Sequence, residues 1–202
     1  ENLWQRLFSL YKLPFIENER IQAEINWYSK HPEYLERVQK NAAPYLFHMV
    51  NEIEKRGLPG ELALLPIVES AYSHGRAAGL WQFIPSTGRA YGLKQTWWYD
   101  GRRDVYASTN AALTYLTKLS KRFDNDWFLA LAGYNAGGGS VSSAIRKNKR
   151  LGRTTDFWAL NLRKETRHYV PKLIAIATIL ANAGKYNVTL IDIPNEPFFE
   201  KV

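Results

Sequence analysis

Apolar residues recur along this chain at the three- and four-residue spacing of an amphipathic α-helix. The clearest case lies between residues 44 and 57, where Pro44 suits the first turn of a helix and Gly57 suits its end. One apolar face of this helix is made by Leu46, Met49, Val50 and Ile53. We expect that face to be buried in a core.

A second stripe with the same spacing predicts another helix, and its members are Ala112, Leu116, Leu119 and Phe123. Residues 127–132 are apolar all round, which predicts a helix buried in the middle of the protein. This helix should stop in the glycine-rich segment 133–139, and Ser140 should then cap a further helix that includes Val141 and Ile145.

The last helix is expected to begin near Tyr169–Pro171 and to end at Gly184. Its apolar run, residues 173–183, is too short to cross a bilayer and predicts a core helix. Residues 186–193 alone have the composition of a strand. The pattern therefore predicts a mainly α fold.

The composition says little about the fold, but it limits the classes of molecule that the protein could bind. Among 202 residues, 46% are hydrophobic and 23% charged, as in an ordinary globular protein. Aromatic residues reach 14%, with 7 Trp and 12 Tyr, and these side chains stack on sugar and base faces as well as in cores. The net charge of +8 favours a polyanionic partner: nucleic acid, an anionic membrane surface or an acidic polysaccharide. Because the chain has no cysteine, disulfides and thiolate metal sites are excluded.

Glu69 is the residue whose position most needs an explanation. It follows an apolar run, residues 64–68, that should lie in the core. A buried carboxylate without a partner costs several kcal/mol (about 2–7 for polar groups, more for ions), so it is either paired or useful as an acid. A glutamate at a helix end or in a salt bridge is the simpler alternative on this segment alone.

Four polar and aromatic segments interrupt the helical pattern. They are residues 69–72 (ESAY), 79–83 (GLWQF), 133–139 (GYNAGGG) and 165–170 (ETRHYV). Each alone also fits an ordinary structural element: a turn that sends an aromatic ring into the core, a helix stop, or a helix start capped by Thr166.

Taken together and in this order, the four segments resemble those of the family 1 lytic transglycosylases. That family carries a Glu-Ser pair, a G-L-[MW]-Q segment, an A-Y-N-[AS]-G segment and an E-T-x-x-Y-V segment, and the resemblance covers about residues 40–183. It implies the lysozyme-like fold that the family shares with goose-type lysozyme. We expect one catalytic domain over residues 1–202: a helical extension (1–40), a lysozyme-like core (41–183) and a C-terminal extension (184–202).

The resemblance implies cleavage of peptidoglycan with a single catalytic acid, Glu69. In the family, one Glu protonates the oxygen between N-acetylmuramic acid and N-acetylglucosamine. It then takes the proton of the muramoyl 6-hydroxyl, which closes on C1 to leave a 1,6-anhydro end. The tethered hydroxyl replaces the second carboxylate of ordinary glycosidases. An apolar setting, which residues 64–68 would supply, raises the pKa of such an acid. Residues matching the family's substrate-binding positions are Gln82, Tyr134, Asn135 and Tyr169.

The chain departs from the family between Glu69 and Gly79, where members have about five more residues. A serine in that insert contacts the acid; Ser73 is the candidate here, without being assigned. Either this loop is short or a stretch of it is missing from the sequence. We expect the segment between Tyr72 and Ala77 to lie at the mouth of the cleft.

No metal or other cofactor is expected, because His31, His48, His74 and His168 lack a shared ligand spacing. The basic run 146–153 is more typical of a solvated face than of a binding patch. Two other functions stay open: a goose-lysozyme-like hydrolase, which would leave reducing ends, and a non-catalytic basic module that binds glycan or nucleic acid. No nucleic-acid-binding motif supports the second.

The resemblance also implies a place in the cell. We expect a monomer that acts on peptidoglycan glycan strands in the periplasm or cell envelope of a Gram-negative bacterium. A lipid anchor outside this chain would hold it at the outer membrane.

Overall fold

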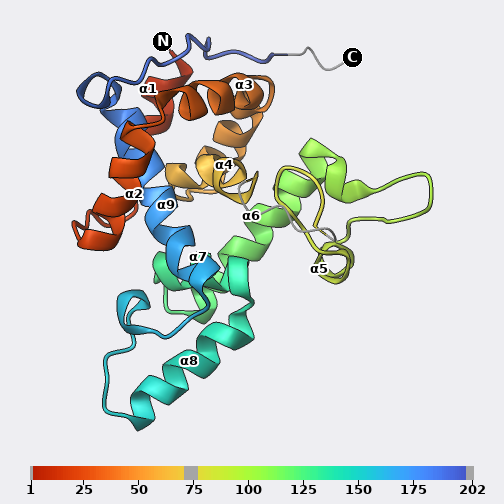
Figure 1. The fold of residues 1–202 in the computed structure, drawn as a ribbon. Helices are drawn as coiled ribbons and strands as arrows, with labels where there is room; N and C mark the ends of the chain where they lie inside the picture. Colours follow the sequence, from red (N-terminus) through yellow and green to blue (C-terminus); the bar gives the residue numbers. More distant parts are fainter. Residues whose placement is uncertain (1, 71–76, 199–202) are drawn as a thin grey trace. The chain divides into compact units, whose positions relative to one another are not determined.

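Helices make up nearly all the regular structure of the protein, as the mainly α expectation required (Figure 1). The computed structural model describes residues 2–70 and 77–198. In these residues the elements in chain order are α1 (Leu3–Ser9), α2 (Glu19–Ser29), α3 (Pro32–Lys55), η1 (Gly60–Leu64), α4 (Leu65–Ser70), α5 (Pro85–Ala90), η2 (Gly101–Arg103), α6 (Val105–Arg122), α7 (Trp127–Ala136), α8 (Gly138–Arg150), η3 (Phe157–Ala159), α9 (Lys164–Ala181) and η4 (Ala183–Tyr186), where η marks a 3₁₀-helix.

The chain divides into two compact units. The first unit is Glu1–Ala111 with Lys172–Val202, and the second is Ala112–Pro171. Helices α6 and α9 each contribute residues to both. The expected single catalytic domain over residues 1–202 stays a prediction.

The core of the first unit is built around α3. The four residues of the predicted apolar stripe, Leu46, Met49, Val50 and Ile53, are each at most 1% exposed. The short element η1 packs against α1, α3 and α4. Gly60 is required at its start, because a Cβ there would lie 2.8 Å from the Cβ of Leu10, whose carbonyl accepts the Gly60 N–H at 2.8 Å. This contact places η1, and hence the start of α4, close to the end of α1.

Helix α3 starts twelve residues before the expected position, so the prediction that Pro44 begins a helix was wrong. Pro32 occupies the first turn, and Pro44 lies inside the helix. A proline within a helix removes one backbone hydrogen bond but does not have to end the helix where packing stabilises both sides. Leu35 and Leu46, on either side of Pro44, are both buried.

The predicted strand at residues 186–193 is also wrong, although the segment is partly buried. Its backbone forms hydrogen bonds with side chains and with the first residue of α1, and not with a neighbouring strand. Gln39 donates to the Thr189 carbonyl at 3.1 Å and accepts the Ile191 N–H at 2.9 Å. Leu3 N–H donates to the Ile193 carbonyl at 2.9 Å, and the Trp4 indole donates to that of Ile191 at 3.0 Å. The C-terminal segment is thereby held along α1 and α3 (Figure 1).

In the second unit, α7 is the buried helix that the apolar run 127–132 predicted. All residues from Phe128 to Gly133 are buried, and Asp126 caps the helix by accepting the Leu129 N–H at 3.1 Å. The predicted cap at Ser140 was wrong: α8 begins at Gly138, with Gly137 at φ +90° before it. A glycine tolerates that positive φ, so α7 can be followed by α8 almost at once.

Helix α9 begins at Lys164, several residues before the expected start at Tyr169–Pro171, and it contains Pro171. Its apolar residues are buried as predicted, among them Leu173, Ile176 and Ile179 at 0% exposure. Among the helices of the described ranges, none is both long enough and apolar enough to pass through a bilayer.

Candidate active site

Glu69 lies in the first unit, at the second-last position of α4, and is only 5% exposed. Its helix follows η1 directly, and the residues before it, Leu64, Leu65 and Val68, are fully buried. The sequence prediction of a glutamate at the edge of an apolar core is therefore confirmed. The segment after it, residues 71–76, which includes Ser73 and the expected cleft-mouth loop, lies outside the described residues.

Gln82 lies in a tight turn that closes on itself. Ala78 N–H donates to the Phe83 carbonyl at 3.1 Å and these two residues form an antiparallel bridge. Within the turn, the Gly79 carbonyl accepts the Gln82 N–H at 3.3 Å and its side-chain Nε2 at 2.7 Å. The GLWQF segment, residues 79–83, is thus a turn that the pairing of Ala78 with Phe83 closes.

The backbone of Gln82 has φ +50°, a left-handed conformation that side chains other than Gly, Asn and Asp rarely adopt. Such strain costs about 1–3 kcal/mol and collects at functional sites. In addition, the Gln82 Oε1 atom is buried and has no hydrogen-bond partner within the described residues. A buried amide oxygen without a donor is free to accept a hydrogen bond from a bound molecule.

Two contacts fix this turn to the rest of the first unit. Trp81 is fully buried, and its indole N–H donates to Thr109 Oγ1 of α6 at 2.9 Å. Gly79, at φ +78°, lies so close to the backbone at Arg102 that an added Cβ would be 1.8 Å from the Arg102 carbonyl oxygen. The turn therefore presents Gln82 from a rigid support.

Asn135 lies in the second unit, near the end of α7, where its side-chain amide belongs to a ring of polar contacts. Thr166 Oγ1 donates to Asn135 Oδ1 at 2.7 Å, and Asn135 Nδ2 donates to Glu165 Oε1 at 3.4 Å. Arg163 closes the ring: its Nε donates to Thr166 Oγ1 at 3.1 Å, and its Nη2 lies 3.8 Å from Glu165 Oε2. The same Nη2 donates to the Asn135 carbonyl at 2.6 Å.

This ring brings two of the four sequence motifs, 133–139 and 165–170, into direct contact. Thr166 is therefore not a helix cap, which was the simpler alternative for its segment. Sequence reasoning missed Arg163 and Thr166 as partners of Asn135, and gave Glu165 no role. One signal in the sequence could have indicated a role for Glu165 and Thr166: both belong to the 165–170 segment, which matches a motif of the lytic transglycosylase family.

The two predicted tyrosines also belong to the second unit. Tyr134 precedes Asn135 on α7 and is half-buried, with its ring 5.5 Å from that of Tyr115. Tyr169 lies in α9 and is fully buried. Their roles in substrate binding stay predictions.

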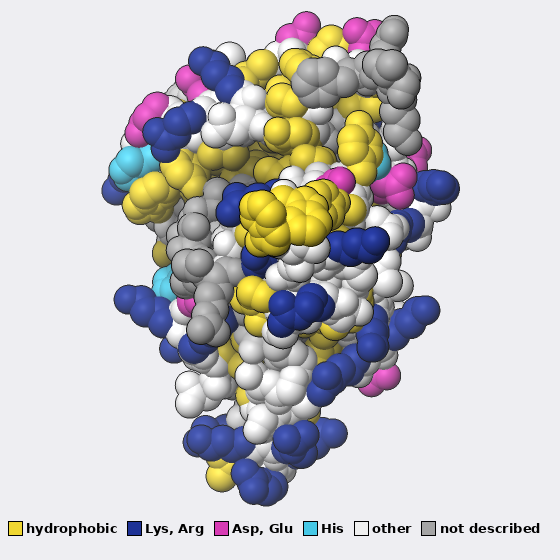
Figure 2. All heavy atoms as spheres, turned by 90° about the vertical axis from the view of Figure 1, so that its right-hand side faces the viewer, with side chains coloured by type: hydrophobic (Ala, Val, Ile, Leu, Met, Phe, Trp, Pro, Cys, Tyr) yellow, Lys and Arg dark blue, Asp and Glu magenta, His cyan; other side chains and the backbone are white. Residues whose placement is uncertain are grey.

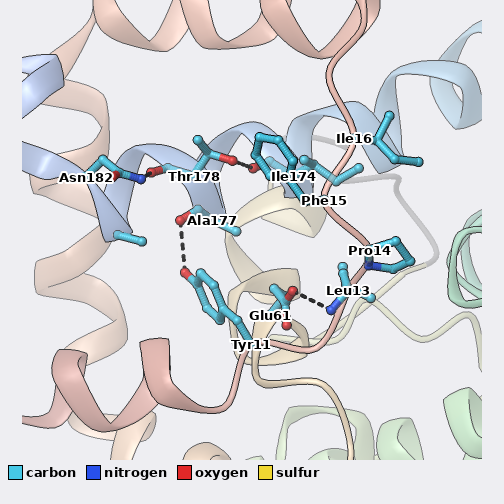
Figure 3. A pocket seen from close by; sticks show the side chains of 11 residues that line it. Tyr11, Leu13, Pro14, Phe15, Ile16, Glu61, Ile174, Ala177, Thr178 and Asn182 are labelled. Atoms are coloured by element: carbon cyan, nitrogen blue, oxygen red, sulfur yellow. Dashed lines mark hydrogen bonds between the residues drawn. The ribbon is translucent and has the colours of Figure 1, made fainter.

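A separate cavity in the first unit contains none of the five predicted site residues. It has a volume of about 190 Å³ and lies between residues 11–16 and the second half of α9 (Figure 3). Glu61 at its wall is 4% exposed and accepts the backbone N–H groups of Lys12 and Leu13, both at 2.8 Å. Burial nevertheless raises the pKa of the Glu61 carboxyl above its ordinary value. Tyr11 donates to the Ala177 carbonyl at 3.0 Å. These bonds hold the segment 11–16 against the unit.

Residues 77–198 and 2–70 contain no cluster of three or more His, Cys, Asp or Glu that could hold a metal ion. The basic run 146–153 forms the end of α8 and the turn after it, and its Lys and Arg side chains are exposed (Figure 2). Asn148 within the run is buried and donates to the Thr154 and Ala159 carbonyls at 2.9 and 3.0 Å.

Comparison with known proteins agrees with the motifs. The transglycosylase SLT domain family matches residues 49–157, a range that contains Glu69, Gln82, Tyr134 and Asn135. Membrane-bound lytic murein transglycosylase D from two strains of Escherichia coli is 48% identical over 194 residues, or 94% of this chain. The chain spans 43% of the length of each of these relatives. On this evidence the chain belongs to the transglycosylase SLT domain family.

Proposed function

We propose that this protein is a peptidoglycan lytic transglycosylase. It cleaves the β-1,4 bond between N-acetylmuramic acid and N-acetylglucosamine and leaves 1,6-anhydromuramic acid ends. The observation that carries the proposal is the buried carboxyl of Glu69 inside the range matched by the SLT family. The relatives named lytic murein transglycosylase support the same reaction.

Glu69 acts first as the acid and then as the base. Its apolar flank disfavours the charged carboxylate, and so does its place near the C-terminal end of α4, where the helix dipole is negative. In its acid form, the Glu69 carboxyl can deliver a proton to the glycosidic oxygen. The carboxylate that results then accepts the proton of the 6-hydroxyl as that oxygen attacks C1.

Gln82, Tyr134, Asn135 and Tyr169 bind and orient the glycan. The Gln82 Oε1 atom is available to accept a hydrogen bond from a sugar hydroxyl or an acetamido N–H. The Asn135 amide, with Oδ1 and one Nδ2 hydrogen held by Thr166 and Glu165, retains a second Nδ2 hydrogen in a fixed direction. Orientation of the sugar matters because an attack by its own hydroxyl depends on geometry rather than on a second carboxylate.

We also infer that the protein works in the cell envelope, where peptidoglycan lies, because its relatives are named membrane-bound murein enzymes. A lipid anchor outside this chain at the outer membrane, and a monomeric state, complete this proposal. Sedimentation equilibrium of the purified chain tests the monomer: a mass above 23.3 kDa that rises with protein concentration contradicts it.

The experiment for the reaction compares the wild type with Glu69→Gln on purified peptidoglycan. Glutamine is nearly isosteric with glutamate but cannot donate the proton. We expect cleavage to fall by at least about 100-fold, the lower range for general acid catalysis, while co-sedimentation with peptidoglycan is retained. A variant that still cleaves at the wild-type rate contradicts the proposal. A wild type that binds nucleic acid but neither binds nor cleaves peptidoglycan would favour the basic module instead.

A further inference from the structure

The loop between α5 and η2 has three large aromatic side chains exposed at its tip. Trp97 is 91% exposed, Trp98 71% and Tyr99 43%. This loop extends from the first unit on the right of Figure 1, and hydrophobic side chains gather on the face shown in Figure 2. Side chains of this size are rarely left in water together unless they meet a partner.

The tip is a hairpin held by several hydrogen bonds, so the fold itself keeps the three aromatic side chains exposed. Thr96 N–H donates to the Tyr99 carbonyl at 2.7 Å, and Tyr99 N–H donates to Thr96 Oγ1 at 3.1 Å. Below the tip, Gln95 and Asp100 form an antiparallel bridge, and Gly101 N–H donates to the Lys94 carbonyl at 2.8 Å. A rigid tip loses little conformational entropy when it binds.

Positive charge surrounds this hairpin. Between residues 84 and 104 there are four cations, Arg89, Lys94, Arg102 and Arg103, and two carboxylates, Asp100 and Asp104, so the hairpin carries a net positive charge. The Asp104 Oδ2 atom accepts the Tyr99 hydroxyl at 3.4 Å. Arg102 pairs with Asp100 at 2.7 Å and lowers the pKa of its carboxyl. Arg89, Lys94 and Arg103 are exposed, and Lys and Arg side chains flank the hydrophobic group in Figure 2. The expected partner is therefore anionic.

The two indole rings do not form a platform for a glycan strand. Their centroids are 5.1 Å apart and their planes are at 88°. Successive sugars of a linear strand stack on rings that lie roughly parallel to the strand, and two perpendicular rings cannot both do so. A lipid interface makes no such demand, because indoles and phenols enter the headgroup region in many orientations.

We propose that the Trp97–Tyr99 tip docks the first unit on an anionic phospholipid bilayer surface. The indoles enter the headgroup region, and Arg89, Lys94 and Arg103 meet the lipid phosphates. The site is independent of glycan cleavage, and it would hold the enzyme at the membrane beside its polymeric substrate. Binding by three side chains and a few cations is weak and reversible.

The test is co-sedimentation of the purified chain with vesicles made of equal parts phosphatidylcholine and phosphatidylglycerol. The wild type should bind these vesicles, and Trp97→Ser with Trp98→Ser should bind at least about tenfold more weakly, since each buried indole contributes more than 1.4 kcal/mol. Phe15→Ser is the matched control, because Phe15 is an aromatic residue of the same unit that is 82% exposed. It should bind like the wild type.

A second arm tests the charges: Lys94→Gln with Arg103→Gln should weaken binding and reduce its dependence on salt. Thermal unfolding shows that the variants are folded. The proposal is overturned if the wild type does not sediment with the vesicles, or if the double Trp variant binds them as the wild type does. It is also overturned if that variant loses binding to purified peptidoglycan while keeping its affinity for vesicles, since the tip would then be a glycan site.

Discussion

Thr166 Oγ1 donates a 2.7 Å hydrogen bond to Asn135 Oδ1, which joins two segments that lie 31 residues apart in the chain. Thr166 is fully buried, and its oxygen also accepts from Arg163 Nε at 3.1 Å. With its oxygen occupied by Thr166, the Asn135 amide has its nitrogen directed to Glu165. One threonine hydroxyl thus fixes which way this predicted substrate-binding amide faces.

Thr166→Val tests the importance of that orientation. Valine fills nearly the same volume but leaves Asn135 Oδ1 without its donor and Arg163 Nε without its acceptor. We expect the free energy of unfolding to fall by about 1–3 kcal/mol, as for unsatisfied buried polar groups. Glycan cleavage by the folded fraction should fall about tenfold or more, since a misplaced binding group loses more than 1.4 kcal/mol.

Thr166→Ser is the control, because serine keeps the hydroxyl and loses only a methyl group. Cleavage assays and urea unfolding of the two variants separate the effects. If Thr166→Val cleaves peptidoglycan as well as Thr166→Ser does, the ring around Asn135 has only a structural role.

Gln82→Asn and Gln82→Val separate the side chain of Gln82 from its strained backbone. Asparagine tolerates φ near +50°, so Gln82→Asn should keep the unfolding free energy within about 1 kcal/mol of the wild type. Valine is β-branched and disfavours that conformation, so Gln82→Val should lose about 1–3 kcal/mol. Both should lose glycan cleavage, because neither places an amide oxygen where Oε1 now lies. If Gln82→Asn cleaves peptidoglycan at the wild-type rate, Gln82 does not bind the substrate.

Gly79→Ala and Gly92→Ala test the contact that supports the same turn. Both glycines have positive φ, +78° and +82°, but only at Gly79 would a Cβ meet backbone, 1.8 Å from the Arg102 carbonyl oxygen. Gly92→Ala should therefore cost about 1–2 kcal/mol for strain alone. Gly79→Ala should cost at least about 3 kcal/mol or prevent folding, because the 79–83 turn and Arg102 must separate. Equal urea midpoints for the two variants would contradict this.

Glu61 makes the stability of the first unit depend on pH. Burial raises the pKa of its carboxyl above the ordinary value of 4.5, so the folded state holds this proton more tightly than the unfolded state does. The stabilisation from Glu61 is therefore complete below pH 4.5 and is lost as the pH rises through the raised pKa. Glu61→Gln should remove this pH-dependent part of the unfolding free energy. Urea midpoints of both proteins across that range measure it, and parallel curves would show that Glu61 does not titrate as described.

Local pattern sufficed for the elements that the sequence predicted well. The apolar face at Leu46, Met49, Val50 and Ile53 and the all-apolar run 127–132 are buried as expected, because each burial pattern repeats within one helix. Element ends were less predictable. Pro44 and Pro171 suggest helix starts by local rules, yet both lie inside helices that packing extends past them.

The contacts that hold the candidate site residues in place could not be predicted from local sequence patterns. Glu69 could be found because its apolar neighbours precede it directly in the chain. The contact of Thr166 with Asn135 depends on how α7 and the start of α9 meet, which no spacing encodes. The positive φ of Gln82 has no signal in its residue type, because glutamine seldom adopts it. It becomes visible only once Ala78 and Phe83 are seen to pair.

The chemical form of the sugar ends released from purified peptidoglycan tests the central claim most directly. If Glu69 works alone and the muramoyl 6-hydroxyl attacks C1, the released fragments end in 1,6-anhydromuramic acid. By mass spectrometry they are lighter by one water than the hydrolytic products, and borohydride does not reduce them. Glu69→Gln should release neither kind. A wild-type digest with mainly reducible ends would mean that water is the attacking group, and the protein would then be a hydrolase of the lysozyme type.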